Sequence, residues 1–292
     1  MLNTEKEKRA IEYLKSFEPQ SEPYYLCYSG GKDSDCIRIL AALAGVKHDI
    51  VNNHTTVDAP ETVRYIRSIP NVQINHPEKT MWQLIVEKGM PPTRLARYCC
   101  EELKEKGGKG RVKITGVRWA ESAPRLERTG VVNFVGKPKT IQKEADKAGI
   151  EYRVNKAGSV VLNDDNDDNR RFVEHCYRTA VTMINPIVDW TDTEVWEFLR
   201  HYGCESNPLY KCGFKRIGCI GCPFGGKYSM LREFARYPKY KQLYIKAFDK
   251  MLEKRRAKGL ETKLGCETGE DVFKWWIGDD PRQMEIFDME HE

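Results

Sequence analysis

The sequence Ser-Gly-Gly-Lys-Asp-Ser at residues 29–34 follows the apolar run Tyr24–Tyr28 and precedes a second apolar run at residues 36–40. This order predicts a strand, a tight loop and then a helix. Glycine lets the backbone turn sharply and approach a ligand closely. The N–H groups of a first helical turn lack partners and carry the positive end of the helix dipole. The stretch therefore predicts a phosphate- or pyrophosphate-binding loop made of Ser29, Gly30, Gly31, Lys32, Asp33 and Ser34.

Two alternatives to a pyrophosphate loop of this kind explain less of the sequence. A glycine-rich turn that binds nothing would not account for a lysine flanked by two hydroxyl residues, Ser29 and Ser34. The Walker loop needs four residues between its first glycine and its Gly-Lys pair. Here Gly30 directly precedes Gly31 and Lys32, so the loop belongs to a different class.

Apolar runs alternate with helical patterns over residues 1–117. We expect strands at residues 24–28, 48–53, 71–75 and 111–117, and helices at 5–17, from 60 onward, at 80–88 and at 100–106. Thr80 is a suitable N-cap residue for the helix at 80–88. This alternation is typical of an α/β protein with a parallel sheet covered by helices. Ligands of such sheets bind at the carboxyl ends of the strands, where the loop at 29–34 lies.

The composition is that of a globular protein with one large domain or two small ones. The chain has 292 residues, of which 40% are hydrophobic and 31% are charged, with a net charge of +5. No apolar stretch reaches the length of about 18 residues that a membrane helix needs, and the first residues lack the apolar core of a signal peptide. We therefore expect a cytoplasmic protein with no membrane partner. Its ten cysteines should be reduced or metal-bound rather than disulfide-bonded.

The chain is expected to divide near residue 200. Residues 1–200 form the predicted nucleotide-binding domain, interrupted by an irregular insertion at about 126–170 that is rich in Gly, Lys, Asn and Asp. Residues 201–292 form a cysteine-containing and helical C-terminal region, in which Lys and Arg outnumber Asp and Glu between residues 231 and 263. These basic helices permit a nucleic-acid partner, although solvated helix faces explain them equally well.

Four cysteines occur as two close pairs. Cys99 and Cys100 are adjacent, and Cys219 and Cys222 form a Cys-x-x-Cys unit, with Cys212 close upstream as a substitute ligand. Thiolates select iron–sulfur clusters or zinc, and four of them complete a site for either. A thioredoxin-like dithiol is the redox alternative, but the chain lacks the pattern of that fold. The thiols that we expect to be buried and structural are Cys27, Cys36, Cys176 and Cys266.

Several segments together resemble the phosphoadenylyl-sulfate (PAPS) reductase family and the wider PP-loop ATP-pyrophosphatase superfamily. The loop at 29–34 resembles the PP-loop, and residues 97–104 resemble the Cys-Cys segment of adenylyl-sulfate reductases. Residues 53–62, 116–125 and 185–191 resemble further segments of the family. The resemblance covers residues 20–225 apart from 126–170. It implies an adenine nucleotide alpha hydrolase-like, Rossmann-like fold.

Within this superfamily the chain resembles the ATP-using, cluster-bearing members most. Sulfonucleotide reductases generally have a degenerate loop and a nucleophilic cysteine in a Glu-Cys-Gly-Leu-His segment, whereas this sequence has the intact loop and no such segment. In adenylyl-sulfate reductases a Cys-Cys pair and a Cys-x-x-Cys unit bind one [4Fe–4S] cluster. The implied ligands here are Cys99, Cys100, Cys219 and Cys222. Enzymes of DNA phosphorothioation and tRNA thiolation are relatives that combine such features.

The resemblance implies ATP and Mg²⁺ as ligands and an adenylated substrate as intermediate. Lys32 would neutralise the departing pyrophosphate. Arg118 and Arg125 follow the fourth expected strand and are candidates to bind phosphate at the same crevice. The structural alternative is that these arginines pair with surface glutamates, Glu121 or Glu127.

Asp33 and Asp58 are the candidate magnesium ligands, since Mg²⁺ offsets phosphate charge in such chemistry. Asp33 can instead cap its helix. A sulfur donor, either a protein or a sulfide held on the cluster, would then displace AMP from the adenylated substrate. This last step is implied by the resemblance alone.

Two other functions stay open. A sulfonucleotide reductase would release sulfite from adenylyl sulfate or PAPS. A nucleic-acid-binding accessory protein would use the loop only to sense nucleotide, and its binding would depend steeply on salt. The sequence names neither the final acceptor nor the oligomeric state, for which a homodimer is one option.

Overall fold

The computed structural model of the protein describes residues 4–135, 138–156, 158–177, 181–260 and 265–278. The chain forms two compact units. The sheet unit comprises residues 1–52, 60–75 and 107–217, and the helical unit comprises residues 53–59, 76–106 and 218–292. The units are thus interleaved along the chain, whereas the sequence analysis divides it once near residue 200.

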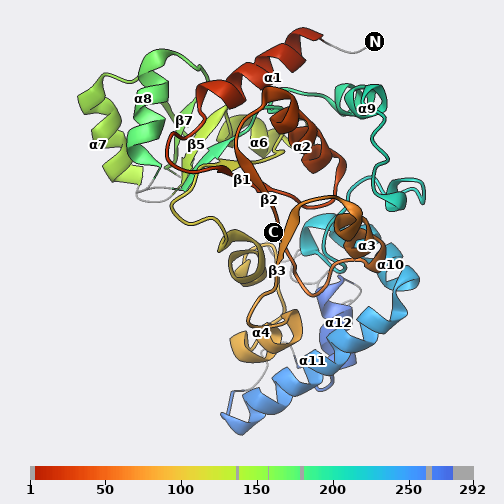
Figure 1. Ribbon diagram of the computed structural model, residues 1–292. Coiled ribbons are helices and arrows are strands. Elements are labelled where there is room, and N and C mark those ends of the chain that lie inside the picture. Colours follow the sequence, from red (N-terminus) through yellow and green to blue (C-terminus); the bar gives the residue numbers. More distant parts are fainter. Residues whose placement is uncertain (1–3, 136–137, 157, 178–180, 261–264, 279–292) are drawn as a thin grey trace, which may run out of the picture. The chain divides into compact units, whose positions relative to one another are not determined.

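A sheet with the strand order β3-β2-β1-β4-β8-β5-β7-β6 forms the centre of the sheet unit (Figure 1). The strands that the sequence predicted are β1 (Tyr24–Cys27), β2 (His48–Asn53), β3 (Val72–Asn75) and β4 (Lys113–Ile114). β1 is parallel to β2 and to β4, and β4 is parallel to β8 (Val181–Ile184). The predicted α/β fold with a mostly parallel sheet is confirmed.

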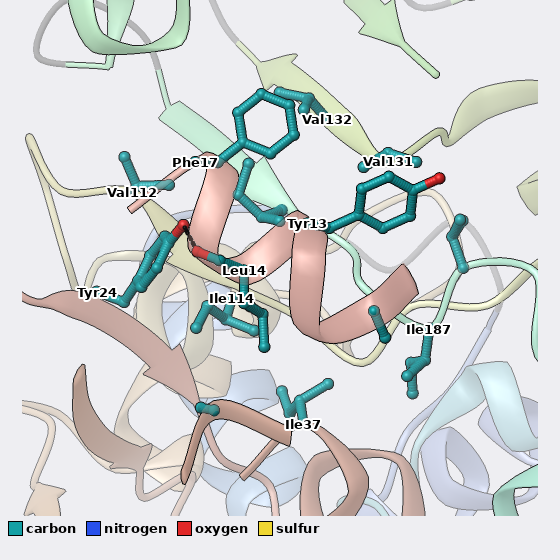
Figure 2. Packing of buried hydrophobic residues seen from close by; sticks show 14 of the residues in the cluster. Tyr13, Leu14, Phe17, Tyr24, Ile37, Val112, Ile114, Val131, Val132 and Ile187 are labelled. Atoms are coloured by element: carbon teal, nitrogen blue, oxygen red, sulfur yellow. Dashed lines mark hydrogen bonds between the residues drawn. The ribbon is translucent and has the colours of Figure 1, made fainter. Parts of the chain in front are cut away.

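Helices cover this sheet through their apolar sides. They include α1 (Thr4–Ser16), α2 (Lys32–Ala44), α3 (Pro60–Ser68) and α9 (Asp192–His201). Figure 2 shows Leu14 of α1 and Ile37 of α2 near Ile114 of β4. The buried hydroxyl of Tyr24 donates a hydrogen bond to the Leu14 carbonyl, at 2.9 Å. This core fixes the position of α2 and therefore of the loop before it.

Residues 126–170 hold regular structure where the sequence suggested an irregular insertion. Its elements are α6 (Ala123–Arg128), β5 (Val132–Val135), α7 (Pro138–Ala148), β6 (Arg153–Val154), β7 (Val160–Leu162) and α8 (Asp167–Cys176). β5 pairs antiparallel with β8 and β7, and β6 pairs antiparallel with β7. These strands lie among Gly, Lys, Asn and Asp residues, which are typical of loops and obscure the short apolar runs. A polar run occupies residues 163–169, and within it the Asn166 side chain caps α8 by accepting the Asn169 N–H.

The helical unit is built around α11 (Pro238–Ala257). This helix packs against α4 (Met81–Lys88), α10 (Gly226–Arg236) and α12 (Gly269–Trp276), and Figure 1 shows it running past α4 and α12. Thr80 caps α4 as predicted, because its side chain accepts the Gln83 N–H. A short helix, α5 (Tyr98–Cys100), continues as a π-helical turn at Glu101–Glu105. The predicted helical C-terminal region is confirmed.

Three 3₁₀ turns complete the description: η2 (Trp119–Glu121), η3 (Pro208–Tyr210) and η4 (Pro223–Gly225). Over the described ranges, every helix is too short or too polar to cross a membrane.

Candidate nucleotide loop and cysteine site

The loop at residues 29–34 connects β1 to α2, as the sequence predicted. Gly30 has a φ of +72°, which favours glycine, and a Cβ at this position would lie 2.8 Å from Ile66. The Gly31 N–H donates to the Ser34 hydroxyl oxygen at 3.0 Å, and that hydroxyl donates to the Gly31 carbonyl at 2.8 Å. Ser34 therefore holds the shape of the loop from within, while Ser29 is exposed.

A segment distant in sequence also holds the loop. The Lys32 N–H donates to the Tyr210 hydroxyl oxygen at 2.9 Å, and the buried Asn207 amide donates to the Gly30 carbonyl at 3.0 Å. Trp196 of α9 packs edge-on against the Tyr210 ring, with centroids 4.9 Å apart. Sequence reasoning missed these residues. Their only local signal is the Asn207–Pro208 pair, which marks a turn.

Four charged side chains meet beside the loop. The Lys32 ammonium lies 3.3 Å from a carboxylate oxygen of Asp33 and 3.4 Å from one of Asp192. The Arg118 guanidinium reaches the same two carboxylates, at 2.7 Å and 2.6 Å. Burial opposes ionisation of Asp192, but the hydrogen bond from Arg118 and the charge of Lys32 outweigh it and lower the pKa of that carboxyl. Asp192 was not singled out by the sequence.

The parallel sheet explains why Arg118 meets the loop. β4 lies next to β1, so the chain after β4 runs beside the start of α2. Gly116 permits this approach, since a Cβ there would lie 2.9 Å from the Asp33 backbone. Arg118 is almost fully buried, with 1% of its side chain exposed, and it also donates to the Trp190 carbonyl at 3.0 Å.

Arg125 has a different environment. Its guanidinium pairs with Glu121 at 2.7 Å, and 40% of its side chain is exposed. This is the surface pairing that the sequence analysis gave as the structural alternative. Burial raises the pKa of Glu121, the Arg125 charge lowers it, and the Asp33 charge raises it. The Arg125–Glu121 pair therefore lies within electrostatic range of the loop.

Asp58 belongs to the helical unit, whereas Asp33 belongs to the sheet unit. One carboxylate oxygen of Asp58 accepts the Thr55 N–H at 2.7 Å and lies 3.0 Å from the His54 ring nitrogen Nδ1. Burial opposes ionisation, yet the hydrogen bonds from His54 and Thr55 outweigh it and lower the pKa of Asp58. This carboxylate is thus ionised and stabilised by its own segment.

The structure gathers the two cysteine pairs in the helical unit. Cys99, Cys100, Cys219 and Cys222 line one small cavity of about 20 Å³. Among the described residues, no group of three or more His, Cys, Asp or Glu side chains already has the arrangement of a metal site. The donor set is that of an iron–sulfur or zinc centre, but the thiols would have to turn toward one point to bind it.

Backbone turns bring these cysteines to the cavity. Cys99 and Cys100 lie in α5, and Cys222 donates its N–H to the Cys219 carbonyl across a tight turn, at 3.3 Å. Gly221 in that turn has a φ of +74°, and a Cβ there would lie 2.6 Å from Phe234. Only glycine fits this combination of φ and close packing.

The thiols influence one another's ionisation. The hydrogen bond from Cys99 lowers the pKa of Cys100 to about 5, and Arg97 and Lys104 act in the same direction. Burial raises the pKa of Cys219, and the negative charge of its ionised form raises the pKa of the neighbouring Lys104. Lys104 also lines the cavity, and sequence reasoning missed it. The available signal was its position four residues after Cys100, since residues four apart share a helix face.

Cys212, the substitute ligand, is exposed and belongs to the sheet unit. Of the four expected structural thiols, Cys36, Cys176 and Cys266 are buried, and Cys27 is partly buried. Burial raises the pKa of Cys27 to about 11 and that of Cys176 to about 12. These thiols are therefore protonated at neutral pH.

The chain belongs to the family of the phosphoadenosine phosphosulfate reductase domain, whose model matches residues 23–224. The match runs from β1 to the Cys-x-x-Cys turn and so includes the loop and all four cavity cysteines. The family resemblance drawn from the sequence is thereby confirmed.

Individual relatives are more distant. The chain is 27% identical to an uncharacterised protein of Methanocaldococcus jannaschii over 240 residues, which cover 79% of this chain and 43% of that protein. A 43-residue stretch, 15% of this chain and 17% of the relative, is 49% identical to an adenosine 5'-phosphosulfate reductase of Allochromatium vinosum. The chain spans about half the length of the longer curated relatives that it matches, such as a second Methanocaldococcus jannaschii protein of which it covers 52%.

Two solved structures are similar at a low level. The PAPS reductase of Candida auris in a phosphate complex aligns with a TM-score of 0.44 and 15% identity, covering 72% of this chain and 87% of that one. The U34-tRNA thiolase NcsA of Methanococcus maripaludis, with its [4Fe–4S] cluster, aligns with a TM-score of 0.39 and 10% identity, covering 91% of this chain and 84% of that one.

Proposed function

We propose that the protein is a PP-loop ATP pyrophosphatase that adenylates a substrate and then takes part in sulfur transfer onto it. The observation that carries this proposal is the loop at residues 29–34. It joins a β-strand of a parallel sheet to the N-terminus of α2, and it holds a lysine of which only 9% of the side chain is exposed. Helix N-termini of this kind bind phosphate groups well.

In this proposal, ATP binds with its β- and γ-phosphates against the loop. Phosphate oxygens replace the carboxylates of Asp33 and Asp192 as partners of Lys32. Arg118 stays fixed between those carboxylates and offsets their negative charge, so that Lys32 is free to pair with phosphate, and Arg125 adds a second guanidinium near it. Asp33 in the sheet unit and Asp58 in the helical unit are each proposed as a Mg²⁺ ligand. The nucleophilic oxygen of the substrate attacks the α-phosphorus, pyrophosphate leaves, and catalysis is mainly positioning and charge stabilisation.

The second part of the proposal concerns Cys99, Cys100, Cys219 and Cys222. Their common cavity supports a four-thiolate site, for which we propose a [4Fe–4S] cluster, with zinc as the alternative. Such a cluster supplies the sulfur chemistry that replaces AMP on the activated substrate. Lys104 beside Cys219 offsets the negative charge of the thiolates. The basic α10 and α11 make a nucleic acid the proposed acceptor and a sulfur-carrying protein the proposed donor.

A second candidate function is reduction of a sulfonucleotide. It is favoured by the family match and by the 43-residue stretch shared with an adenosine 5'-phosphosulfate reductase. That reaction would release sulfite without consuming ATP. The intact loop with its buried lysine favours the first proposal, because a sulfonucleotide has no pyrophosphate group to hold.

The reaction products separate these functions. The full chain, purified without oxygen, is incubated with α-³²P-labelled ATP, Mg²⁺ and either tRNA or DNA. We expect pyrophosphate in an amount equal to the sum of labelled AMP released and labelled AMP bonded to the nucleic acid, with little product from the Lys32→Ala variant. Release of ADP and phosphate would contradict adenylation. Thioredoxin-dependent release of sulfite from adenylyl sulfate or PAPS, with no ATP turnover, would establish the reductase instead.

A further inference from the structure

The sheet unit has a second cavity on the flank of α2. Its volume is about 570 Å³, and its walls come from α2, the end of α3 and residues 202–211. Cavities of this size accommodate small organic ligands. The lining residue Arg38 follows Lys32 by six residues, which is about 9 Å along the helix. Residues 29–34 are not among the lining residues, so this cavity is distinct from the nucleotide loop.

Hydrogen-bond donors without a partner line this cavity. Arg38 Nε and Ser206 Oγ are both buried and have no hydrogen-bond partner in the described part of the chain. Leaving such groups unpaired is costly, and native structures usually satisfy them with protein, water or a ligand. Lys211 adds an exposed ammonium that forms no salt bridge with the residues described here.

Among the side chains that line the cavity, two cations stand against one anion, and the Asp35 carboxylate behind Arg38 offsets part of that excess. Asp35 lies behind Arg38, with 3.9 Å between carboxylate and guanidinium, but its oxygens already accept the Tyr28 and Tyr65 hydroxyls at 2.7 Å and 2.9 Å. The other close neighbour of the Arg38 guanidinium is the Cys204 sulfur at 3.9 Å, a weak acceptor. Among the lining residues, one acidic side chain, Glu205, stands against the two cations.

Apart from Ser68, whose hydroxyl donates to the Tyr65 carbonyl at 2.7 Å, the remaining walls are mainly apolar or aromatic. The Tyr65 hydroxyl is held by Asp35 and the Tyr202 hydroxyl by Glu7, so both rings present their carbon faces to neighbouring groups. Ile39 and Ile69 add aliphatic surface. This combination of clustered donors and apolar walls suits a ligand with an anionic group attached to an organic body.

We propose that this cavity is a second binding site, for a small phosphate-bearing molecule. Arg38, Ser206 and Lys211 hold the phosphate, since arginine matches phosphate geometry and lysine adds charge. Tyr65 and Tyr202 flank the organic part. The site does not depend on the function proposed for the loop, because it shares no lining residue with it.

Calorimetric titration of the full chain tests this site, with inorganic phosphate, pyrophosphate and AMP as separate probes. Every protein in this experiment also carries Lys32→Ala. This substitution weakens binding of the probes at the loop, so that the titration reports mainly on the second site. We expect at least one probe to bind in this background. Arg38→Gln, and independently Lys211→Gln, should weaken that binding by about tenfold or more, as loss of a charged hydrogen bond predicts.

Arg64→Gln, which replaces an exposed arginine of the same unit outside the lining, is the matched control and should bind as the background does. Lys211 is exposed, so its variant should fold even if Arg38→Gln does not. Binding of AMP in preference to inorganic phosphate would support the role of the tyrosine walls. Absence of binding by all three probes in the Lys32→Ala background would overturn the proposal. Equal binding by the Lys211→Gln, Arg38→Gln and Arg64→Gln variants would do the same.

Discussion

The nucleotide loop and the cysteine cavity differ in how completely the protein satisfies their polar groups. Around the loop, Lys32 has two carboxylate partners, and Arg118 has two carboxylates and a carbonyl. Around the cavity, Cys99 and Cys100 are hydrogen-bonded to each other, Cys219 donates to the Thr55 hydroxyl at 3.4 Å, and Arg97 and Lys104 are the nearby cations. The protein alone therefore fixes the geometry of the loop. We expect the cysteine site to reach its final geometry only when metal binds, because metal binding and local folding are coupled at such sites.

The first way to test this comparison has the largest expected effect. Cys219→Ser or Cys222→Ser should remove the iron from anaerobically purified protein, because a four-thiolate site with one hard ligand binds a cluster poorly. Iron content and the visible absorption spectrum provide the measurement. Cys212→Ser is the matched control, since Cys212 is an exposed cysteine of the other unit. Full iron content in both test variants, or zinc in place of iron in the wild type, would refute the cluster.

The second test concerns stability at the loop. Arg118→Met should lower the free energy of unfolding by about 2 kcal/mol, because it removes a buried cation and leaves the largely buried Asp33 carboxylate with Lys32 alone, while the exposed Asp192 carboxylate is screened by water. Urea denaturation measures this change. Arg125→Met removes a half-exposed ion pair and should cost about 1 kcal/mol or less. If the two variants lost similar amounts of unfolding free energy, burial of Arg118 would not strengthen its ion pairs relative to the exposed Arg125 pair.

Local sequence predicted the loop well, and the reason is physical. The apolar strand, the glycines and the start of the helix are contiguous in the sequence. Each is specified by its own local residues, so their order can be read without knowledge of tertiary packing. Arg118 was predicted at the same crevice because neighbouring parallel strands end together. The residues that complete the site, Asn207 and Tyr210, come from a turn that only tertiary packing brings to the loop.

The cysteine site was predictable in composition but not in geometry. More than a hundred residues separate Cys100 from Cys219, and their spacing alone does not place them together. The family resemblance paired them, and the structure puts them around one cavity. The antiparallel strands β5, β6 and β7 escaped prediction because the Gly, Lys, Asn and Asp residues around them are typical of loops. The role of Lys104 was missed because a charged residue in a helix is usually solvated.

The third test measures ligand binding at the loop. Lys32→Ala should weaken ATP or pyrophosphate binding by roughly tenfold to a hundredfold, since a charged hydrogen bond contributes about 1.5–3 kcal/mol. Ser34→Ala should weaken it as well, because the Ser34 hydroxyl holds the Gly31 backbone in place. Calorimetry at constant Mg²⁺ gives both values. Unchanged affinity in both variants would remove the loop as the nucleotide site.

The fourth test has the smallest expected effect and compares the stabilities of the two units. Thr80 and Thr191 are matched helix caps: each accepts the N–H of the residue three positions later at 3.3 Å, and Gln83 or Glu194 returns the bond. Thr80→Ala and Thr191→Ala should each cost about 1 kcal/mol of stability. Thr80 caps α4 in the helical unit, so its loss should reduce protection from hydrogen exchange mainly in α4 and α11. Thr191 caps α9 in the sheet unit, so its loss should act mainly there. If either variant reduced protection equally in both units, the two units would unfold together. Separate unit stabilities would then not explain why the loop is rigid and the cysteine site is adaptable.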